Sequence, residues 1–175
     1  WHWSGSARAV EEMGLRAALS AAFFDFDDPG RAQSMREQVM HLHDLSRSFS
    51  DRILFMLGPH AIYTVSTDSL RWLADYAGEH ELIMHMHLSE TRKEVEDCVA
   101  KYGQRPVEYL HQLGFLSPKL ILTHAIWLEE QEMALLAEHG VQIVHCPVSN
   151  MKLSSGQFQY KALAEHGVSI ALGTD

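Results

Sequence analysis

Six short apolar runs recur along the chain, and a helical pattern separates most of them from the next. The runs are mostly continuous and cover residues 15–24, 53–57, 82–87, 120–123, 141–144 and 168–172. Continuous apolar runs of this length are typical of strands that are buried on both faces of a parallel sheet. Because a helix leads from one strand to the next, the pattern predicts βα units that follow one another along the chain.

Helical patterns fill the intervals between the apolar runs. Apolar residues recur at helical spacing over 35–49 and 70–77, and further helices are expected over 91–102, 106–113 and 128–139. Ser66 precedes the second of these helices and can cap it. Glycines stand where the helices should stop, at Gly103, Gly114, Gly140 and Gly167.

This periodicity is compatible with a doubly wound sheet and with a (β/α)8 barrel of the TIM type. The barrel is favoured because polar residues follow nearly every predicted strand, whereas an open sheet concentrates them at one switch point. Six strands are predicted here, which is fewer than a closed barrel has. We therefore expect residues 1–175 to form one partial barrel domain of about six βα units that lacks the N-terminal strands.

The net charge and the residue counts limit which kinds of molecule the chain can bind and where it is expected to work. A formal net charge of −9 disfavours a nucleic-acid backbone or an anionic membrane surface. No apolar run approaches the roughly 18–20 residues that a membrane span needs. Two cysteines are too few for a disulfide framework, so a cytoplasmic location is expected. The twelve histidines point instead to metal or proton chemistry.

Residues of metal-ligand type follow five successive predicted strands, namely His60, His87, His124, His145 and Asp175. In a barrel these positions meet at one rim, where the active site is built. Neutral imidazoles and a carboxylate can hold Zn²⁺, or alternatively Fe²⁺, with one position open for water. Such an ion lowers the pKa of its bound water toward neutrality, which favours metal-assisted hydrolysis.

Two other histidine pairs have the spacing of a ligand pair. His85 and His87 lie two apart on a strand and share a face, so His85 is an alternative second ligand. His41 and His43 lie two apart in a helical pattern and cannot converge on one ion. We expect both of these helical histidines to face solvent.

Several strings in the chain resemble those of the amidohydrolase superfamily. They are GPHAIYTVS, HMHLSET, YGQRPVEYLHQLGFL, THAIWL, HCPVSNMKLSSG and ALGTD, and they span essentially the whole chain in the expected order. Within the superfamily the sequence is most similar to the 5-methylthioadenosine/S-adenosylhomocysteine deaminase branch. Triazine chlorohydrolases and guanine deaminase are more distant relatives.

The resemblance implies a role for individual residues. His87 would be a metal ligand, and Asp175 would touch the metal and take the proton from its water. Glu90 would bind the substrate and protonate the purine ring nitrogen beside the attacked carbon. His124 would contact the metal-bound water, and His60 would contact the substrate base. His145, Asn150 and Lys152 would belong to a loop that shapes the pocket.

The sequence departs from the family pattern at three places. The first-strand HxH pair of metal ligands is absent, and Gln159 stands where the family usually has a proline. Ala21 stands where S-adenosylhomocysteine deaminases have an arginine that holds the substrate carboxylate, and Arg31 is the candidate to take part of that role.

The resemblance therefore implies a hydrolase acting on a carbon–nitrogen bond of a purine nucleoside. Metal-bound hydroxide would release ammonia from an adenosine-type substrate such as 5′-methylthioadenosine or S-adenosylhomocysteine. A triazine-type chlorohydrolase or a guanine-type deaminase with the same site is the alternative within the superfamily. A catalytically incomplete barrel fragment is the alternative of another class. The sequence favours zinc over iron without deciding the native metal. It also leaves open whether the full-length protein forms a homo-oligomer.

Overall fold

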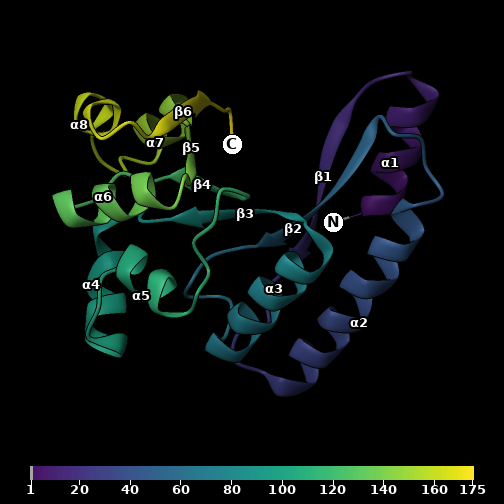
Figure 1. Cartoon of the computed structure of the whole chain (residues 1–175), viewed down its shortest axis with the longest axis horizontal. Coiled ribbons are helices and arrows are strands. Elements are labelled where there is room, and N and C mark those ends of the chain that lie inside the picture. The colour runs from purple at the N-terminus through teal and green to yellow at the C-terminus, as the bar shows by residue number, and fades with distance from the viewer. Residues whose placement is uncertain (1) are drawn as a thin grey trace. The chain divides into compact units, whose positions relative to one another are not determined.

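A computed structural model describes residues 2–175, in which strands and helices alternate along the chain (Figure 1). Within that range the strands are β1 (Ala17–Phe23), β2 (Ile53–Pro59), β3 (Ile83–Leu88), β4 (Leu120–His124), β5 (Gln142–His145) and β6 (Ser169–Leu172). The helices are α1 (Trp3–Glu12), α2 (Pro29–Ser46), α3 (Thr67–His80), α4 (Arg92–Tyr102), α5 (Pro106–Gln112), α6 (Glu130–Glu138), α7 (Pro147–Lys152) and α8 (Tyr160–Glu165). Each predicted apolar run coincides with one strand, so the predicted strand positions are confirmed.

The order of the strands decides between the two fold classes that periodicity left open. Neighbouring strands in the sheet follow the chain from β1 to β6. The pairs β1–β2, β2–β3, β4–β5 and β5–β6 are parallel. A doubly wound sheet reverses its strand order at a switch point, and the described strands show no reversal. The expected series of βα units from an incomplete (β/α)8 barrel is therefore confirmed.

The chain divides into two compact units, of which the first comprises Trp1–His60 and Thr64–His85. In this unit β1 pairs with β2 from Ala17 opposite Ile53 to Phe23 opposite Pro59, and β2 continues onto the first half of β3. Helices α1 and α2 pack against β1 and β2, and α3 packs against β2. The core of this unit consists of fully buried apolar side chains, including Phe23, Leu57, Leu70 and Leu73.

A glycine is required at the end of β2 because β1 approaches its backbone closely. A Cβ atom at Gly58 would lie 2.9 Å from the Cβ atom of Ser20 and 3.2 Å from the carbonyl oxygen of Ala21. The chain then turns at Pro59 and presents His60, whose backbone N–H donates to the carbonyl of Phe23 at 3.0 Å. Close strand packing therefore positions the GPH segment.

The second unit comprises Ala61–Tyr63 and Met86–Asp175. Here β4 pairs with β5 from Ile121 opposite Gln142, and β5 pairs with β6 as far as His145 opposite Leu172. The side chains of Leu88, Leu110, Phe115, Leu120, Leu122, Leu136 and Ile143 are fully buried in this unit. The strands β4, β5 and β6 of this unit have five, four and four residues.

Helix ends agree with the capping signals in the sequence. The Ser66 side chain accepts the Ser69 N–H at the start of α3, and Thr91 does the same for Glu94 at the start of α4. Gly103, directly after α4, and Gly114, two residues after the end of α5, adopt left-handed φ angles of +70°. Among the helices of residues 2–175, none has both the length and the apolar character needed to cross a membrane.

Three helices were not expected from the sequence, namely α1, α7 and α8. Both α7 and α8 have six residues, which is too short for an apolar period to be recognised. Helix α2 also begins earlier than the apolar pattern, at Pro29, because Asp28 caps it and its first turns are polar.

The expectation that His41 and His43 both face solvent is half wrong. His41 is exposed, but His43 is buried, with 9% of its surface exposed. Its ring stacks on Phe55 at 5.1 Å between centroids, and Nδ1 lies 2.8 Å from the Tyr76 hydroxyl. A tyrosine hydroxyl satisfies the imidazole, which allows a histidine on the inner face of the helix.

Candidate active site

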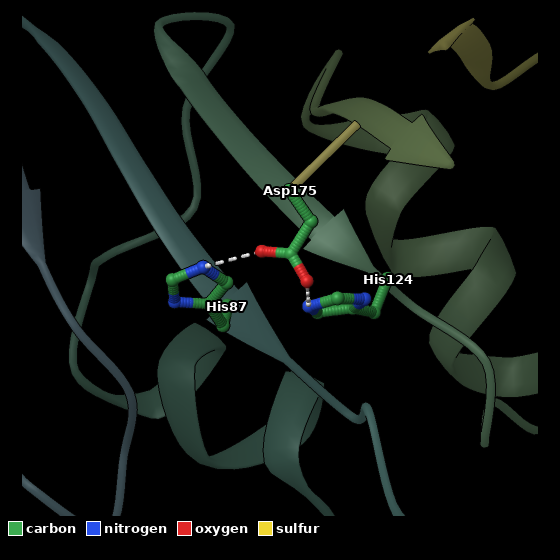
Figure 2. A group of neighbouring side chains, drawn as sticks. All are labelled: His87, His124 and Asp175. Carbon is green, nitrogen blue, oxygen red and sulfur yellow. Dashed lines mark ion pairs between the residues drawn. The ribbon is translucent and has the colours of Figure 1, made fainter. Parts of the chain in front are cut away.

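Three strands of the second unit end at one cluster of side chains. His87 lies near the end of β3, His124 is the last residue of β4, and Asp175 follows β6. Figure 2 shows the Asp175 carboxylate between the two imidazole rings, with one oxygen toward each. Oδ1 lies 3.8 Å from Nε2 of His87, and Oδ2 lies 3.8 Å from Nε2 of His124. Parallel strands explain this convergence, because their carboxyl ends share one edge.

The three side chains fit a divalent metal ion. One ligand atom from each residue lies within 4.8 Å of the other two. Two imidazole nitrogens and a carboxylate oxygen are donors that Zn²⁺ and Fe²⁺ accept. The 3.8 Å separations are longer than hydrogen bonds, and they are near the ~3.4 Å between two tetrahedral ligands placed about 2.1 Å from an ion. Within the described residues this group includes His87 and does not include His85.

The backbone at these strand ends is strained. Ser89, His124, Ala125 and Asp175 have positive φ angles of 52°, 73°, 46° and 69°. Each such residue costs about 1–3 kcal/mol and persists only where its surroundings hold it. The N–H of Ala125 donates to the carbonyl of Leu88 at 3.0 Å, which ties the end of β4 to the end of β3. Strain of this kind is concentrated at functional sites.

Glu90 lies beside the donor group without belonging to it. Its Oε2 atom is 3.7 Å from Nε2 of His124, and its Oε1 atom accepts a hydrogen bond from the Ser155 hydroxyl at 3.2 Å. The Glu90 side chain is 19% exposed, against 1% for that of His124. A carboxylate in this position can exchange a proton with a bound small molecule.

A second carboxylate, that of Glu94, shapes the loop that carries Glu90. Its two oxygens accept the backbone N–H groups of Ser89 at 2.9 Å and Glu90 at 2.8 Å. Burial raises the pKa of Glu94 to about 7, and the backbone donors only partly oppose that shift. Glu94 therefore holds the backbone of Ser89 and Glu90 from a buried position.

We expect Glu94→Gln to remove one component of the pH dependence of stability. The pKa of Glu94 is raised from 4.5 to about 7 in the folded chain, so the folded state binds more protons than the unfolded state between these values. The contribution of Glu94 to the free energy of unfolding is therefore highest below pH 4.5 and falls as pH rises toward 7. The full shift corresponds to about 3 kcal/mol.

Urea unfolding from pH 4 to 8 measures the free energy of unfolding of the parent and of the Glu94 variant. Glu96→Gln is the control, because Glu96 is exposed on the same helix. The stability difference between the Glu94 variant and the parent should change with pH by a few kcal/mol. A difference that is constant over this range would contradict the raised pKa.

The segment 147–155 contacts three of the side chains described above. The Ser149 hydroxyl donates to Oδ2 of Asp175 at 2.5 Å, and Oδ1 of Asn150 lies 2.9 Å from Nδ1 of His124. Ser155 supplies the hydrogen bond to Glu90. The sequence expectation placed Asn150 in a pocket-shaping loop and gave no role to the two serines. The only signal for them was that both serines lie in the string HCPVSNMKLSSG, which begins at the last residue of β5 and carries part of the family resemblance.

His145 lies at the end of β5 and outside the donor group. Its ring stacks on Phe158, with 4.1 Å between centroids, and its Nδ1 lies 3.3 Å from Nδ2 of Asn150. Burial, together with the nearby His124, lowers the pKa of His145. His145 therefore lies beside the group formed by His87, His124 and Asp175 and is not a member of it in this structure.

Two expected substrate contacts, His60 and Arg31, lie in the first unit. His60 is exposed, and its Nδ1 lies 2.9 Å from the Thr64 hydroxyl. Arg31 lies in α2, where its Nε donates to the carbonyl of Phe24 at 2.9 Å and its guanidinium lies 4.9 Å from the centre of the Phe26 ring. The Arg31 side chain is thus held against the loop between β1 and α2.

Comparison with known proteins identifies the family of the chain. The sequence model of the amidohydrolase family matches residues 4–175. The 5-methylthioadenosine/S-adenosylhomocysteine deaminase 1 of Archaeoglobus fulgidus is 45% identical over 171 residues, which are 97% of this chain and 40% of that protein. A 5′-deoxyadenosine deaminase of Methanoregula boonei is 41% identical over 175 residues, which are 97% of this chain and 39% of that protein.

The same similarity extends to solved structures. An adenosine deaminase from Xanthomonas campestris with bound zinc matches with a TM-score of 0.91 and 36% identity, covering 100% of this chain and 40% of that one. This chain thus spans about 40% of the length of the relatives that it matches. Since the family model covers nearly every residue, the chain belongs to the amidohydrolase family.

Proposed function

We propose that the chain carries part of the active site of a metal-dependent hydrolytic deaminase that releases ammonia from an adenosine-type nucleoside. The observation that carries this proposal is the Glu90 carboxylate beside the group formed by His87, His124 and Asp175. The two curated relatives above, 45% and 41% identical, are named for adenosine-type substrates. Neither name mentions guanine or a triazine, so those alternatives are less well supported.

We infer that His87 and Asp175 would hold a divalent ion directly, with Nε2 of His124 beside them. When bound, the ion would supply Lewis-acid activation of a water molecule. The zinc in the Xanthomonas campestris relative supports zinc in preference to iron. The side chains of His87 and Asp175 are 32% and 29% exposed in this chain.

Each residue of the site has its own role in moving protons or contacting the substrate. Asp175 takes one proton from the attacking water and passes it to the leaving amino group, while His124 contacts that water. Glu90 gives its proton to the purine ring nitrogen beside the attacked carbon and regains one from the new hydroxyl group. Both carboxyl groups return to their starting state, and the products are the oxo-nucleoside and ammonia. His60 would contact the substrate base.

We further propose that residues 1–175 are part of one barrel domain of a longer enzyme, since the chain spans about 40% of its relatives. Its partner would be a purine nucleoside rather than a nucleic acid or a membrane. A cytoplasmic location and a homo-oligomer remain expectations from the sequence.

The test is an assay for ammonia release by the longer protein, with and without added zinc. Its substrates are 5′-methylthioadenosine, S-adenosylhomocysteine, 5′-deoxyadenosine, guanine and a chlorotriazine. We expect zinc-dependent release from the adenine nucleosides. Turnover of guanine or the triazine alone, or release that does not respond to metal, would contradict the proposal. The same assay on the 175-residue chain tests whether it is catalytically incomplete by itself.

The longer protein is also expected to prefer 5′-methylthioadenosine over S-adenosylhomocysteine. Ala21 stands in β1 where an arginine would bind the homocysteine carboxylate, and its side chain is buried. A bidentate arginine–carboxylate contact is about twice as strong as a neutral hydrogen bond, so its absence should lower the affinity for the charged tail. The ratio of kcat/KM for the two substrates measures this.

Arg31 provides the control for the substrate preference. If Arg31 binds the tail instead, Arg31→Gln lowers kcat/KM for S-adenosylhomocysteine and leaves that for 5′-methylthioadenosine unchanged. A clear preference of the parent protein for S-adenosylhomocysteine would contradict the prediction.

A further inference from the structure

Asn150 joins two histidines of the second unit through the two ends of its side-chain amide. Its Oδ1 lies 2.9 Å from Nδ1 of His124, and its Nδ2 lies 3.3 Å from Nδ1 of His145. Asn150 and His124 are buried, with 3% and 1% of their surfaces exposed. The Asn150 backbone is also held, because its N–H donates to Cys146 and its carbonyl accepts from Ser155, both at 2.9 Å.

The chemistry of the amide makes the two contacts different. An amide oxygen only accepts hydrogen bonds, so the His124 nitrogen that faces it must carry a proton. An amide NH₂ only donates, so the His145 nitrogen that faces it must be unprotonated. When both imidazoles are neutral, the Asn150 amide therefore favours the Nδ1–H tautomer of His124 and the Nε2–H tautomer of His145.

We propose that Asn150 is a positioning residue that keeps a proton on Nδ1 of His124 and on Nε2 of His145. For His124, the consequence is that Nε2 carries the lone pair of the neutral ring. This atom faces Asp175 at 3.8 Å and Glu90 at 3.7 Å, where the attacking water and the ion of the proposed function would lie. The lowered pKa of His145 agrees with a neutral ring at that position.

The role of Asn150 rests on the proposed function, in which His124 contacts the attacking water. With the proton on Nδ1, Nε2 of the neutral His124 ring can accept a hydrogen bond or a proton from that water and cannot donate one. A group that orients a histidine through its other nitrogen is a common device around metal sites. With the contacts of Ser149 to Asp175 and of Ser155 to Glu90, segment 147–155 contacts three side chains of the cluster, those of His124, Asp175 and Glu90.

The tautomers are measured by long-range ¹H–¹⁵N correlation spectra of the metal-free protein, at a pH where both imidazoles are neutral. In the parent protein we expect Nδ1–H for His124 and Nε2–H for His145. Asn150→Asp keeps an acceptor toward His124 but removes the donor toward His145. It should leave the His124 tautomer unchanged and abolish the preference of His145 for Nε2–H. Asn150→Leu should abolish both preferences.

Met151→Ala is the matched control, because Met151 is exposed on the same helix, and it should change neither tautomer. An Nε2–H tautomer of His124 in the parent protein would overturn the proposal even if the leucine variant did not fold. An unchanged His145 tautomer in the aspartate variant would overturn it as well. The spectra require no substrate or turnover, so their outcome is independent of whether the longer protein deaminates a nucleoside.

Discussion

Replacing Glu90 by glutamine should lower the turnover of the longer protein by about 10²–10⁴-fold, with the metal content unchanged. Glutamine keeps the size of the side chain and can still meet the Ser155 hydroxyl, which lies 3.2 Å from Oε1 of Glu90. It cannot give a proton to the purine ring nitrogen or take one back. The expected loss is therefore in kcat, because the variant keeps the residues that would bind the substrate and the metal.

Glu96→Gln is the control for this experiment, since Glu96 is an exposed carboxylate on the helix that follows Glu90. Its turnover should equal that of the parent protein. Metal per chain is measured after dialysis for both variants. Loss of metal from the Glu90 variant would show that Glu90 is a ligand and that its assigned role is wrong.

The second large effect concerns zinc affinity. The 175-residue chain should bind zinc about 10⁴-fold more weakly than the longer protein. The described residues bring together His87, His124 and Asp175, whereas the family resemblance implies two further histidines from a first strand. Structural zinc sites with four ligands bind with about 10–16 kcal/mol, or roughly 3 kcal/mol per ligand. Two missing ligands then cost about 6 kcal/mol, which corresponds to the stated loss.

Competition with a chromophoric chelator measures the zinc affinity of both proteins. His87→Ala should weaken the residual binding by the chain further, by about 10²-fold on the same reckoning. His111→Ala is the matched control, because His111 is an exposed histidine on α5. Stoichiometric, tightly held zinc in the 175-residue chain would mean that another ligand takes part, with His85 or His145 as the candidates.

The sequence was most informative where a single physical requirement acts over a few neighbouring residues. Burial on both faces makes the strands continuous apolar runs, so all six strands could be located. Ser66 could be recognised as a cap because its side-chain acceptor and the N–H partner lie within one turn. The donor residues could also be proposed, because each lies at or just beyond the carboxyl end of a strand and parallel strands end at one edge.

The sequence was misleading where a contact from another element decides burial, and it gave no signal where an element is too short to show a period. His43 was expected to face solvent, but Tyr76 of α3 and Phe55 of β2 bury its ring. The six residues of α7 are too few for a periodic pattern, so the sequence predicts a loop there. Neither outcome could follow from spacing within one segment.

The sequence by itself determined the βα order, the strand ends and the residue types of the candidate metal group, because these depend on local periodicity and on the direction of parallel strands. Only the tertiary structure decided how the group is held. The Glu94 carboxylate accepts the backbone N–H of Glu90, and the Asn150 amide oxygen contacts Nδ1 of His124, a residue 26 positions earlier in the sequence. Hydrogen bonds require specific atoms to approach within about 3 Å. That geometry exists only after the strands and α7 have packed, since nothing in the spacing of the residues encodes which end of an amide meets which nitrogen.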